Sequence, residues 1–297
     1  MLKALLVLSL ASILFAELKT HKLHSKLSLP IVQGKIKFLD VKEVVFKKNF
    51  YELSGIEYDN GRLYGISDKG YIYYMSINIE NDRIKSLSLD KTVKLKQGNI
   101  KGKIDSEGII LRDDYFYLSF ERDPKIGKYS LNGKHIKTQK IDKELKKINN
   151  YRGENKGLES IAHSKKYGII TAPEVPLKST IEYMHALYSK NDTWYFPYKA
   201  PLSSMAFMSK NKLLMIQRKY NKETFDAKVY LTQVNLKKCV FGVCRSKILA
   251  TLQTKDGWNI DNFEGLTQID KTRFLMISDN NDNPKQKTLL VLFEVLD

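Results

Sequence analysis

The sequence contains few cysteines, prolines and glycines. Its 297 residues include two cysteines, seven prolines and 16 glycines. Two cysteines exclude a disulfide-dense scaffold and a four-thiolate zinc site, and so little Pro and Gly excludes a collagen-like or linker-dominated chain. Acidic residues are also in deficit: 33 Asp and Glu against 50 Lys and Arg give a formal net charge of +17. Hydrophobic residues make up 42 % of the chain, which is enough for one large domain or two small ones.

Motifs of several enzyme classes are absent as well. The sequence has no Gly-x-Ser-x-Gly elbow, which disfavours a serine hydrolase built on that turn. It has no glycine-rich phosphate loop, and its five histidines lack the spacing seen in zinc hydrolases. The acidic residues are therefore the main candidates for chemistry.

The N-terminus has the pattern of a secretory signal peptide. Lys3 supplies a positive charge, the apolar stretch from Ala4 to Phe15 follows, and Ala16 is the small residue that signal peptidase requires. The stretch is shorter than the ~20 residues that span a bilayer, although an uncleaved anchor stays an alternative. We expect residues 1–16 to be a cleaved signal peptide and residues 17–297 to form a single domain. The mature protein would be periplasmic or secreted, without stable membrane insertion.

The charge of the mature chain, +16 after loss of Lys3, favours an anionic partner. For an exported protein a phosphorylated small molecule, an anionic lipid or a polysaccharide fits this charge better than nucleic acid does. We expect an anionic small-molecule substrate or ligand, no nucleic-acid partner and a monomer. The alternative is that the lysines only solvate the surface.

The two cysteines are close together, in the segment Cys239-Val240-Phe241-Gly242-Val243-Cys244. In an oxidising compartment they can close across a hairpin whose turn contains Gly242. We predict a local disulfide. The spacing is not that of a redox motif, and no further metal ligand stands nearby.

Five segments of the sequence share one pattern. Each has a small or acidic residue, then Gly or Ser with an apolar pair, a polar turn such as Asp59-Asn60-Gly61, a β-rich run and a closing charged residue. The opening residues are taken as Ser54, Glu107, Glu159, Ser204 and Glu264, and the closing residues as Asp68, Glu121, Glu174, Arg218 and Asp279. The opening and closing residues are 14 or 15 positions apart in every copy. Short strands joined by such turns form hairpins.

The opening residues follow one another at steps of 53, 52, 45 and 60 residues. A hairpin-based unit of about 40 to 50 residues is the size of a four-stranded propeller blade. We predict an all-β fold, a β-propeller of five four-stranded blades. A sixth, degenerate blade within 81–104 or 219–250 stays an alternative. The best short helix candidate, Lys143 to Asn150, is interpreted as a solvated excursion between blades. The ring should close by pairing Thr288–Val295 with Ile36–Phe46, because such a clasp removes exposed sheet edges.

In a propeller the innermost strands line a central channel, so equivalent positions of the repeats converge. The sequence therefore predicts a ring of carboxylates at one mouth of the channel, which needs a positive partner because like charges repel. Ca²⁺ is the predicted cofactor, since it takes six to eight oxygen ligands; the guanidinium of Arg218 and protonation of one acid are the alternatives. The predicted ligands are Glu107, Glu159, Glu264, Asp279 and Asn280. The Asp/Asn run that contains Asn280 can equally be an ordinary turn.

The same segments resemble the phytase-like family, described as "esterase-like activity of phytase". The resemblance covers roughly residues 45–295, and the segments that carry it are Leu53–Ile56 with Ser67-Asp68, Asp105–Gly108, Gly157–Glu159, and Asn262–Leu266 with Ser278–Asn281. It implies an exported propeller that hydrolyses phosphate or other esters. Two positions depart from the family pattern: Ser160 replaces an expected Gly, and Gln217-Arg218 replaces an expected Glu-Arg.

Two functions follow. The first is metal-assisted hydrolysis of an anionic ester, with Arg218 neutralising the substrate and Glu121 or Glu174 as general base. The second is a non-catalytic periplasmic propeller that binds a ligand or an envelope partner with the same charged face.

Overall fold

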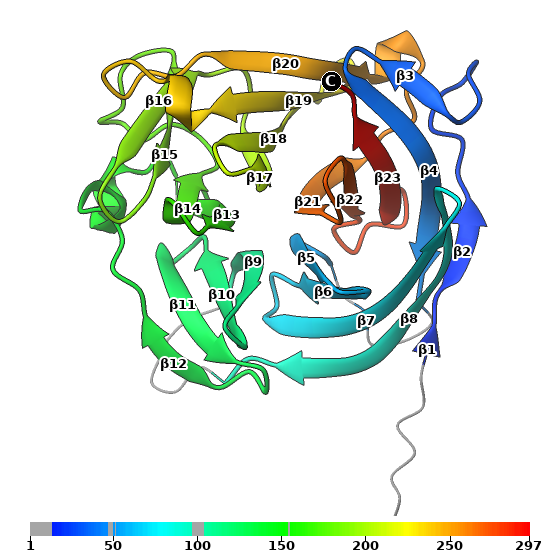
Figure 1. Cartoon of the computed structure of the whole chain (residues 1–297), viewed down its shortest axis with the longest axis horizontal. Helices are drawn as coiled ribbons and strands as arrows, with labels where there is room; N and C mark the ends of the chain where they lie inside the picture. Colours follow the sequence, from blue (N-terminus) through cyan, green and yellow to red (C-terminus); the bar gives the residue numbers. More distant parts are fainter. Residues whose placement is uncertain (1–13, 47–49, 51, 97–103, 154) are drawn as a thin grey trace, which may run out of the picture.

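The computed structural model describes residues 14–46, 50, 52–96, 104–153 and 155–297. Five antiparallel sheets are arranged around a central axis (Figure 1). The predicted five-bladed β-propeller is therefore confirmed. Among the described residues, no helix is both long enough and apolar enough to cross a membrane.

Blades 1 and 2 are single runs of the chain from the inner to the outer strand. Their strands are β5 (Gly55–Asp59), β6 (Arg62–Ile66), β7 (Tyr71–Glu80) and β8 (Arg83–Lys94), then β9 (Ser106–Arg112), β10 (Tyr115–Phe120), β11 (Lys125–Ser130) and β12 (His135–Thr138). The inner turns are tight, because Asn60-Gly61 and Asp113-Asp114 all adopt positive φ, as predicted for Asn-Gly-like turns.

Blades 3 and 4 repeat this order. Their strands are β13 (Leu158–Ser164), β14 (Gly168–Pro173), β15 (Met184–Tyr188) and β16 (Thr193–Pro197), then β17 (Leu202–Ser209), β18 (Lys212–Asn221), β19 (Asp226–Asn235) and β20 (Ser246–Gln253). The stretches proposed for a sixth blade belong to blades 1 and 4 wherever they are described. Between blades 2 and 3 the chain forms two 3₁₀ turns, η1 (Glu144–Lys146) and η2 (Ile148–Asn150), in place of a longer helix.

Blade 5 closes the ring. It consists of β21 (Asn262–Gln268), β22 (Arg273–Asp279), β23 (Leu289–Val295), β4 (Ile36–Val45) and β2 (Glu17–Thr20), with β3 (Ile31–Gln33) also on β4. The C-terminal strand pairs with β4 from Leu289↔Glu43 to Val295↔Ile36. The predicted pairing of the two ends of the chain is therefore confirmed, and both edges that would otherwise be exposed are bonded.

The N-terminal residues extend two blades. A short strand, β1 (Leu14–Phe15), adds to the outer edge of β8, and the Ala16 amide donates to the Leu87 carbonyl at 2.9 Å. Cleavage after Ala16 would remove β1 and leave β2 as the first strand. Residues 1–13 lie outside the described residues, so the signal peptide stays a prediction.

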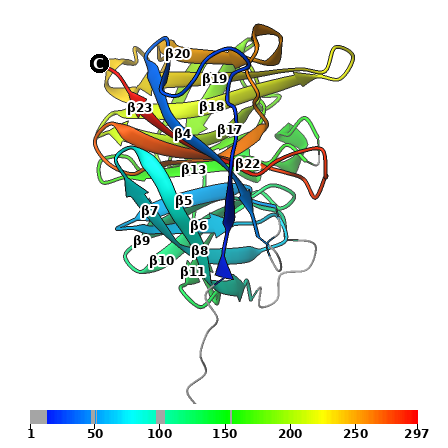
Figure 2. The same ribbon diagram turned by 90° about the vertical axis from the view of Figure 1, so that its right-hand side faces the viewer.

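The apolar core is divided among the interfaces between blades. Five clusters of buried side chains each join two neighbouring blades, for example Phe38 and Phe263 of blade 5 with Leu231 of blade 4. Edge-on, the tip of the β18–β19 hairpin and the loop after β22 project on the same side of the disc (Figure 2). That side carries the closing residues of the repeats, so it is the side of the predicted site.

The predicted disulfide between Cys239 and Cys244 is present. It lies between β19 and β20, after the 3₁₀ turn η3 (Leu236–Lys238), and another turn, η4 (Thr254–Asp256), follows β20.

Candidate active site

The opening residues of the inner strands lie in β-bulges. In β13 and β21 the register shifts so that Glu159 and Glu264 are extra residues without a direct partner on the second strand. In β9 the shift falls at Glu107 and Gly108, which together oppose Ser119. A bulge bends the strand and redirects a side chain, so three glutamates that are far apart in sequence point toward one mouth of the channel.

Blade 4 requires a correction. Its bulged residue is Ser203, because Leu202 pairs with Gln217 and Ser204 with Ile216. Ser204, predicted to be the opening residue, instead occupies the position of the glycines that follow the bulge in blades 2 and 5. Ser203 Oγ donates to the Phe263 carbonyl at 2.8 Å and thereby links blades 4 and 5. No carboxylate enters the ring from this blade.

Gly157 lets the chain before β13 approach Glu121 closely. A Cβ at position 157 would lie 1.9 Å from the Glu121 carbonyl oxygen, a distance that no side chain tolerates. The Glu174 amide also donates to the Gly157 carbonyl at 3.2 Å. The glycine therefore brings the closing residues of blades 2 and 3 to the start of the third inner strand.

Two groups of carboxylates share one member at the mouth. Oxygen atoms of Asp105, Glu107 and Glu121 all lie within 4.8 Å of one another, and so do those of Glu121, Glu159 and Glu174. Glu121 and Glu159 are only 8 % and 7 % exposed. Buried carboxylates at this spacing repel one another unless a proton or a cation is shared among them.

The fourth blade contributes the main counter-charge. Arg218 Nη2 donates to Glu264 Oε1 at 2.5 Å, and Asn262 Nδ2 donates to the same oxygen at 2.7 Å. A second donor of this guanidinium, Arg218 Nε, is buried and has no hydrogen-bond partner in the described part of the chain. Glu264, predicted to be a metal ligand, therefore has Arg218 and Asn262 as its partners here.

Burial and mutual repulsion raise the pKa values of these acids. Burial is the main cause for Glu107 and Glu159, whose pKa values lie well above the usual range, with further increases from neighbouring glutamates. Burial followed by Asp105 and Glu174 raises the pKa of Glu121 to about 7, and burial followed by Glu264 raises that of Asp279 to about 7. Part of the cluster is therefore protonated at neutral pH when nothing cationic is bound.

Two predicted ligands are occupied by their own loop. Asp279 Oδ1 accepts a hydrogen bond from the Asn281 amide at 3.0 Å, and Asn280 Oδ1 accepts one from the Asp282 amide at 3.3 Å. Positive φ at Asn281 and Asp282 completes a tight turn. The run thus forms the ordinary Asp/Asn turn that was the alternative interpretation. Asp279 nevertheless belongs to the site, because it is only 5 % exposed and the nearby Glu264 carboxylate contributes to its raised pKa.

Three site residues were missed by the sequence analysis. Asp105 belongs to one carboxylate group, Lys156 forms an ion pair with Glu174, and Glu52 lies 3.4 Å from Lys69 Nζ. Glu52 and Lys156 each come one residue before a segment quoted for the family resemblance, and Asp105 is the first residue of such a segment. Charged residues at the start of these three repeats were the signal that would have identified them.

The donors fit a hard divalent cation. All five members of the two groups offer carboxylate oxygen, the ligand type that Ca²⁺ prefers. Asp68 Oδ1, at the same mouth, is buried without a hydrogen-bond partner in the described residues. A cation would relieve the repulsion and replace the protons that the raised pKa values imply.

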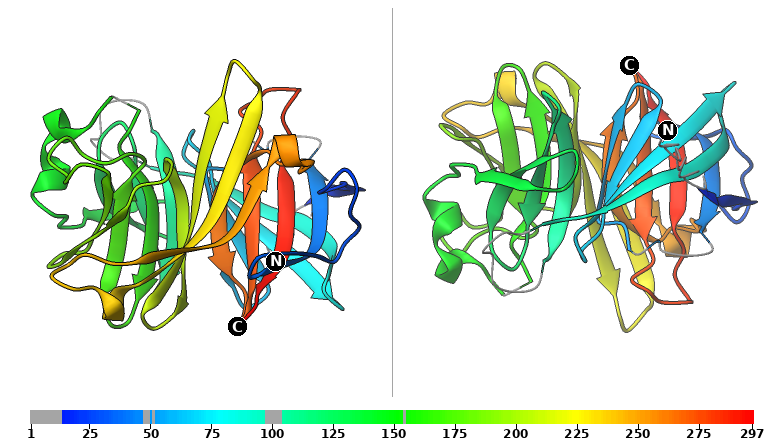
Figure 3. Two further views of the ribbon diagram at one scale, coloured as in Figure 1. Left: turned by 90° about the horizontal axis from the view of Figure 1, so that it is seen from above. Right: turned by 90° about the horizontal axis from the view of Figure 1, so that it is seen from below.

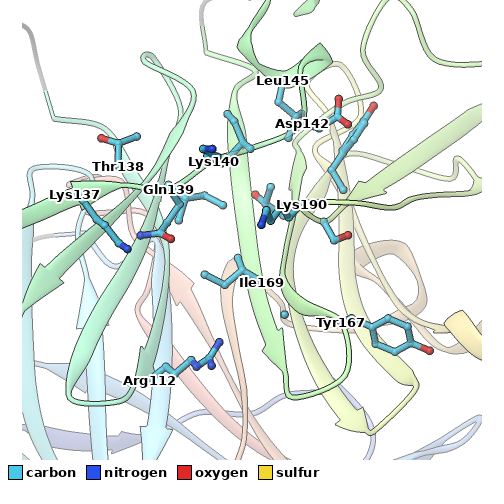
Figure 4. A pocket seen from close by; sticks show the side chains of 16 residues that line it. Arg112, Lys137, Thr138, Gln139, Lys140, Asp142, Leu145, Tyr167, Ile169 and Lys190 are labelled. Atoms are coloured by element: carbon cyan, nitrogen blue, oxygen red, sulfur yellow. The ribbon is translucent and has the colours of Figure 1, made fainter.

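A separate pocket of about 520 Å³ lies between blades 2 and 3 (Figure 4). Its wall includes Arg112, Lys137, Lys140 and Lys190 but none of the mouth carboxylates. The channel mouth, with its convergent acids, is therefore the better candidate for chemistry.

Comparison with known proteins identifies the family. The sequence pattern of the phytase-like family, described as esterase-like activity of phytase, matches residues 48–282. The chain belongs to this family. No curated protein matches the sequence significantly.

Two solved structures align with most of the chain, at low identity and low TM-score. The PQQ-bound aldose sugar dehydrogenase from Streptomyces coelicolor is 12 % identical, with a TM-score of 0.46 over 89 % of this chain and 99 % of that one. An inactive virginiamycin B lyase from Staphylococcus aureus with quinupristin is 11 % identical, with a TM-score of 0.39 over 94 % of this chain and 80 % of that one.

Proposed function

We propose that the channel mouth of this phytase-like protein hydrolyses an anionic ester, a phosphate ester above all, with the help of a bound divalent cation. The observation that carries the proposal is Arg218, whose Nη2 is held by Glu264 while its buried Nε lacks a partner among the described residues. An unpaired buried donor is costly, so an anionic oxygen at Nε would be stabilised. Guanidinium groups are well suited to phosphate oxygens. The description of the family supports an ester substrate.

The carboxylates at the mouth make a bound cation necessary for an anionic substrate. Fully ionised, Glu107, Glu121 and Glu159 would repel an anionic substrate at the position that Arg218 favours. A divalent cation held by either group, Asp105 with Glu107 and Glu121 or Glu121 with Glu159 and Glu174, would reverse that effect. When bound, such an ion polarises the ester and lowers the pKa of an attacking water.

Other residues position groups or move protons. Asn262 and Glu264 hold the Arg218 guanidinium, so Glu264 would act on the substrate through Arg218. Asp279, with a pKa of about 7, can accept a proton from water near neutral pH. Glu174 is paired with Lys156, and Glu121 belongs to both oxygen-donor groups. Asp279 is therefore the better general base than the two glutamates expected from the sequence.

The test is hydrolysis by the purified protein of p-nitrophenyl phosphate, phytate and short acyl esters, with Ca²⁺ or with a chelator. We expect turnover of a phosphate ester that the chelator abolishes, and a loss of about 10²-fold in Arg218→Gln. Glu121→Gln should lose the turnover that Ca²⁺ supports, because it removes the carboxylate shared by both groups. Glu223→Gln, an exposed acid at the tip of the β18–β19 hairpin, is the matched control and should keep full activity.

Equal turnover in Glu121→Gln, Arg218→Gln and the control would contradict the proposal, because any activity would then arise elsewhere. Binding of phosphate esters without turnover would instead support the non-catalytic propeller.

A further inference from the structure

The disulfide loop between β19 and β20 is a rigid turn fixed to a neighbouring blade. Val240 and Val243 exchange two backbone hydrogen bonds of 2.9 Å inside the Cys239–Cys244 disulfide. The loop is also bonded to β16 of blade 3, because the Tyr195 amide donates to the Gly242 carbonyl at 2.8 Å and the Cys244 amide to the Tyr195 carbonyl at 2.7 Å. The turn therefore cannot fold back to cover its own side chains.

The tip of this loop exposes apolar side chains. Phe241 is 101 % exposed, Val240 66 % and Val243 44 %, and Ile248 at the start of β20 is 41 % exposed. Single exposed apolar residues are common on protein surfaces, but a contiguous group on a rigid support indicates a docking surface.

Cations surround the apolar tip. The stretch 235–247 contains no acid. Together with the turns 164–167, 189–192 and 209–212 at the same ends of blades 3 and 4, it carries nine cations and a single acid, Asp192. The nine are Lys165, Lys166, Lys190, Lys210, Lys212, Lys237, Lys238, Arg245 and Lys247. We call the tip and these cations the loop patch.

The loop patch lies on the face opposite the acidic mouth. Strand β18 runs from Lys212 to Arg218 at the mouth, and the Leu236 amide bonds the Asn211 carbonyl at the other end of the strand. In the left view of Figure 3 the β18–β19 tip (yellow) and the loop after β22 (red) point upward, while the chain before β20 (gold) lies at the bottom. A flat partner on the loop patch would leave the mouth open to solvent.

We propose that the loop patch docks the protein on an anionic lipid bilayer, with Phe241 inserted at the level of the headgroups. The charge favours lipid, because an anionic surface attracts every cation of the patch at once, and each adds about fivefold to the affinity at low salt. Aromatic and aliphatic side chains at a basic surface are the usual anchors of peripheral membrane proteins. A rigid tip loses little conformational entropy on insertion.

The experiment uses the full chain with vesicles of equal parts phosphatidylglycerol and phosphatidylcholine, with brominated acyl chains as quencher. The native Trp194 and Trp258 are buried, so Phe241→Trp adds the one exposed indole. We expect its emission to move to shorter wavelength and to be quenched. Phe225→Trp is the matched control, because Phe225 is 76 % exposed at the tip on the mouth side; it should show neither change. The comparison is independent of residues 1–16, which both variants share.

Binding is measured by co-sedimentation with the same vesicles. Phe241→Asp should lower the affinity by at least about tenfold, and Lys237→Glu with Lys238→Glu should do so as well. Phe225→Asp should have no effect, and 0.5 M salt should release the wild type because it screens the charges. Four results would overturn the proposal: an unquenched Phe241→Trp, quenching equal to that of Phe225→Trp, equal binding to pure phosphatidylcholine, or dimerisation that Phe241→Asp abolishes without any lipid binding.

Discussion

Replacing Glu121 by Gln removes the carboxylate that both oxygen-donor groups share. Its pKa is raised from 4.5 to about 7, chiefly by burial. Because the folded-state value is the higher one, the stability associated with its proton is fully present below pH 4.5 and is lost as the pH rises through about 7. The difference corresponds to about 3 kcal/mol, and the side chain is only 8 % exposed, so solvent screening reduces it little.

We therefore expect Glu121→Gln to be more stable than the wild type at pH 8 in a chelating buffer, and equally stable at pH 4. The gain at pH 8 should be about 3 kcal/mol, or roughly 8 °C in Tm for a chain of this size. Adding Ca²⁺ at pH 8 should raise the Tm of the wild type, because an ion that binds only the folded state stabilises it. The variant should gain much less.

Thermal unfolding followed by circular dichroism measures the stability difference between the two proteins at pH 8 and at pH 4 in chelator. The same measurement with Ca²⁺ at pH 8 gives the rise in Tm of each protein. Glu223→Gln serves as control and should follow the wild type. The reasoning fails if Glu121→Gln is no more stable than the wild type in chelator at pH 8, since the repulsion would then be absent. It also fails if both proteins respond equally to Ca²⁺, since Glu121 would then have no part in holding the ion.

Three further predictions concern the ion pair, the close approach and the far end of the channel. Arg218→Gln should destabilise the protein by about 3 kcal/mol because it leaves Glu264 buried without a cation, with only Asn262 bonded to it. In urea unfolding, the double variant with Glu264→Gln should recover most of the loss, and additive losses would exclude direct coupling. Gly157→Ala should cost about 2 kcal/mol or more, since its Cβ would meet the Glu121 carbonyl at 1.9 Å, whereas Gly153→Ala, with the nearest atom at 3.4 Å, should be near neutral in the same assay. Glu57, in β5, lines a pocket with Ile110 and Ala206 of other inner strands at the end of the channel opposite the acidic mouth. Burial raises its pKa to about 8, so stability is lost as the pH rises through 8, and Glu57→Gln should raise the Tm at pH 9 but not at pH 4. Because this side chain is partly exposed, the gain should be roughly 2 kcal/mol rather than the full shift, and an equal gain at both pH values would refute it.

Much of the fold was predictable because each blade is local in sequence. The repeat at Leu53 to Asp68 contains its own turn, and Asn60-Gly61 adopts the positive φ that such residues favour. The pairing of β23 with β4 was also predictable, since the residues left at the two ends together make one blade. The disulfide followed from two neighbouring cysteines.

The candidate site was predictable only in part. The spacing brought Glu107, Glu159 and Glu264 to one mouth, but it assigned Ser204 to the position that Ser203 occupies. A bulge lets two residues oppose one on the neighbouring strand. Copies whose opening and closing residues are 14 or 15 positions apart can therefore have the same register. Counting along the chain does not show which residue is the extra one. The partners of each carboxylate were equally hidden, because they come from other blades.

The sequence by itself determined the repeated blade, the clasp between the chain ends, the disulfide turn and the convergence of acids on one end of the channel; it favoured five blades but left a sixth open. These depend on alternation, turn residues and spacing, all of which act within a few tens of residues. Only the tertiary structure decided that Arg218 pairs with Glu264, that Glu121 joins two carboxylate groups, and that the basic apolar loop faces away from them. Distances across a channel depend on how closely five inner strands pack and on where each one bulges, and neither quantity is written in any single repeat.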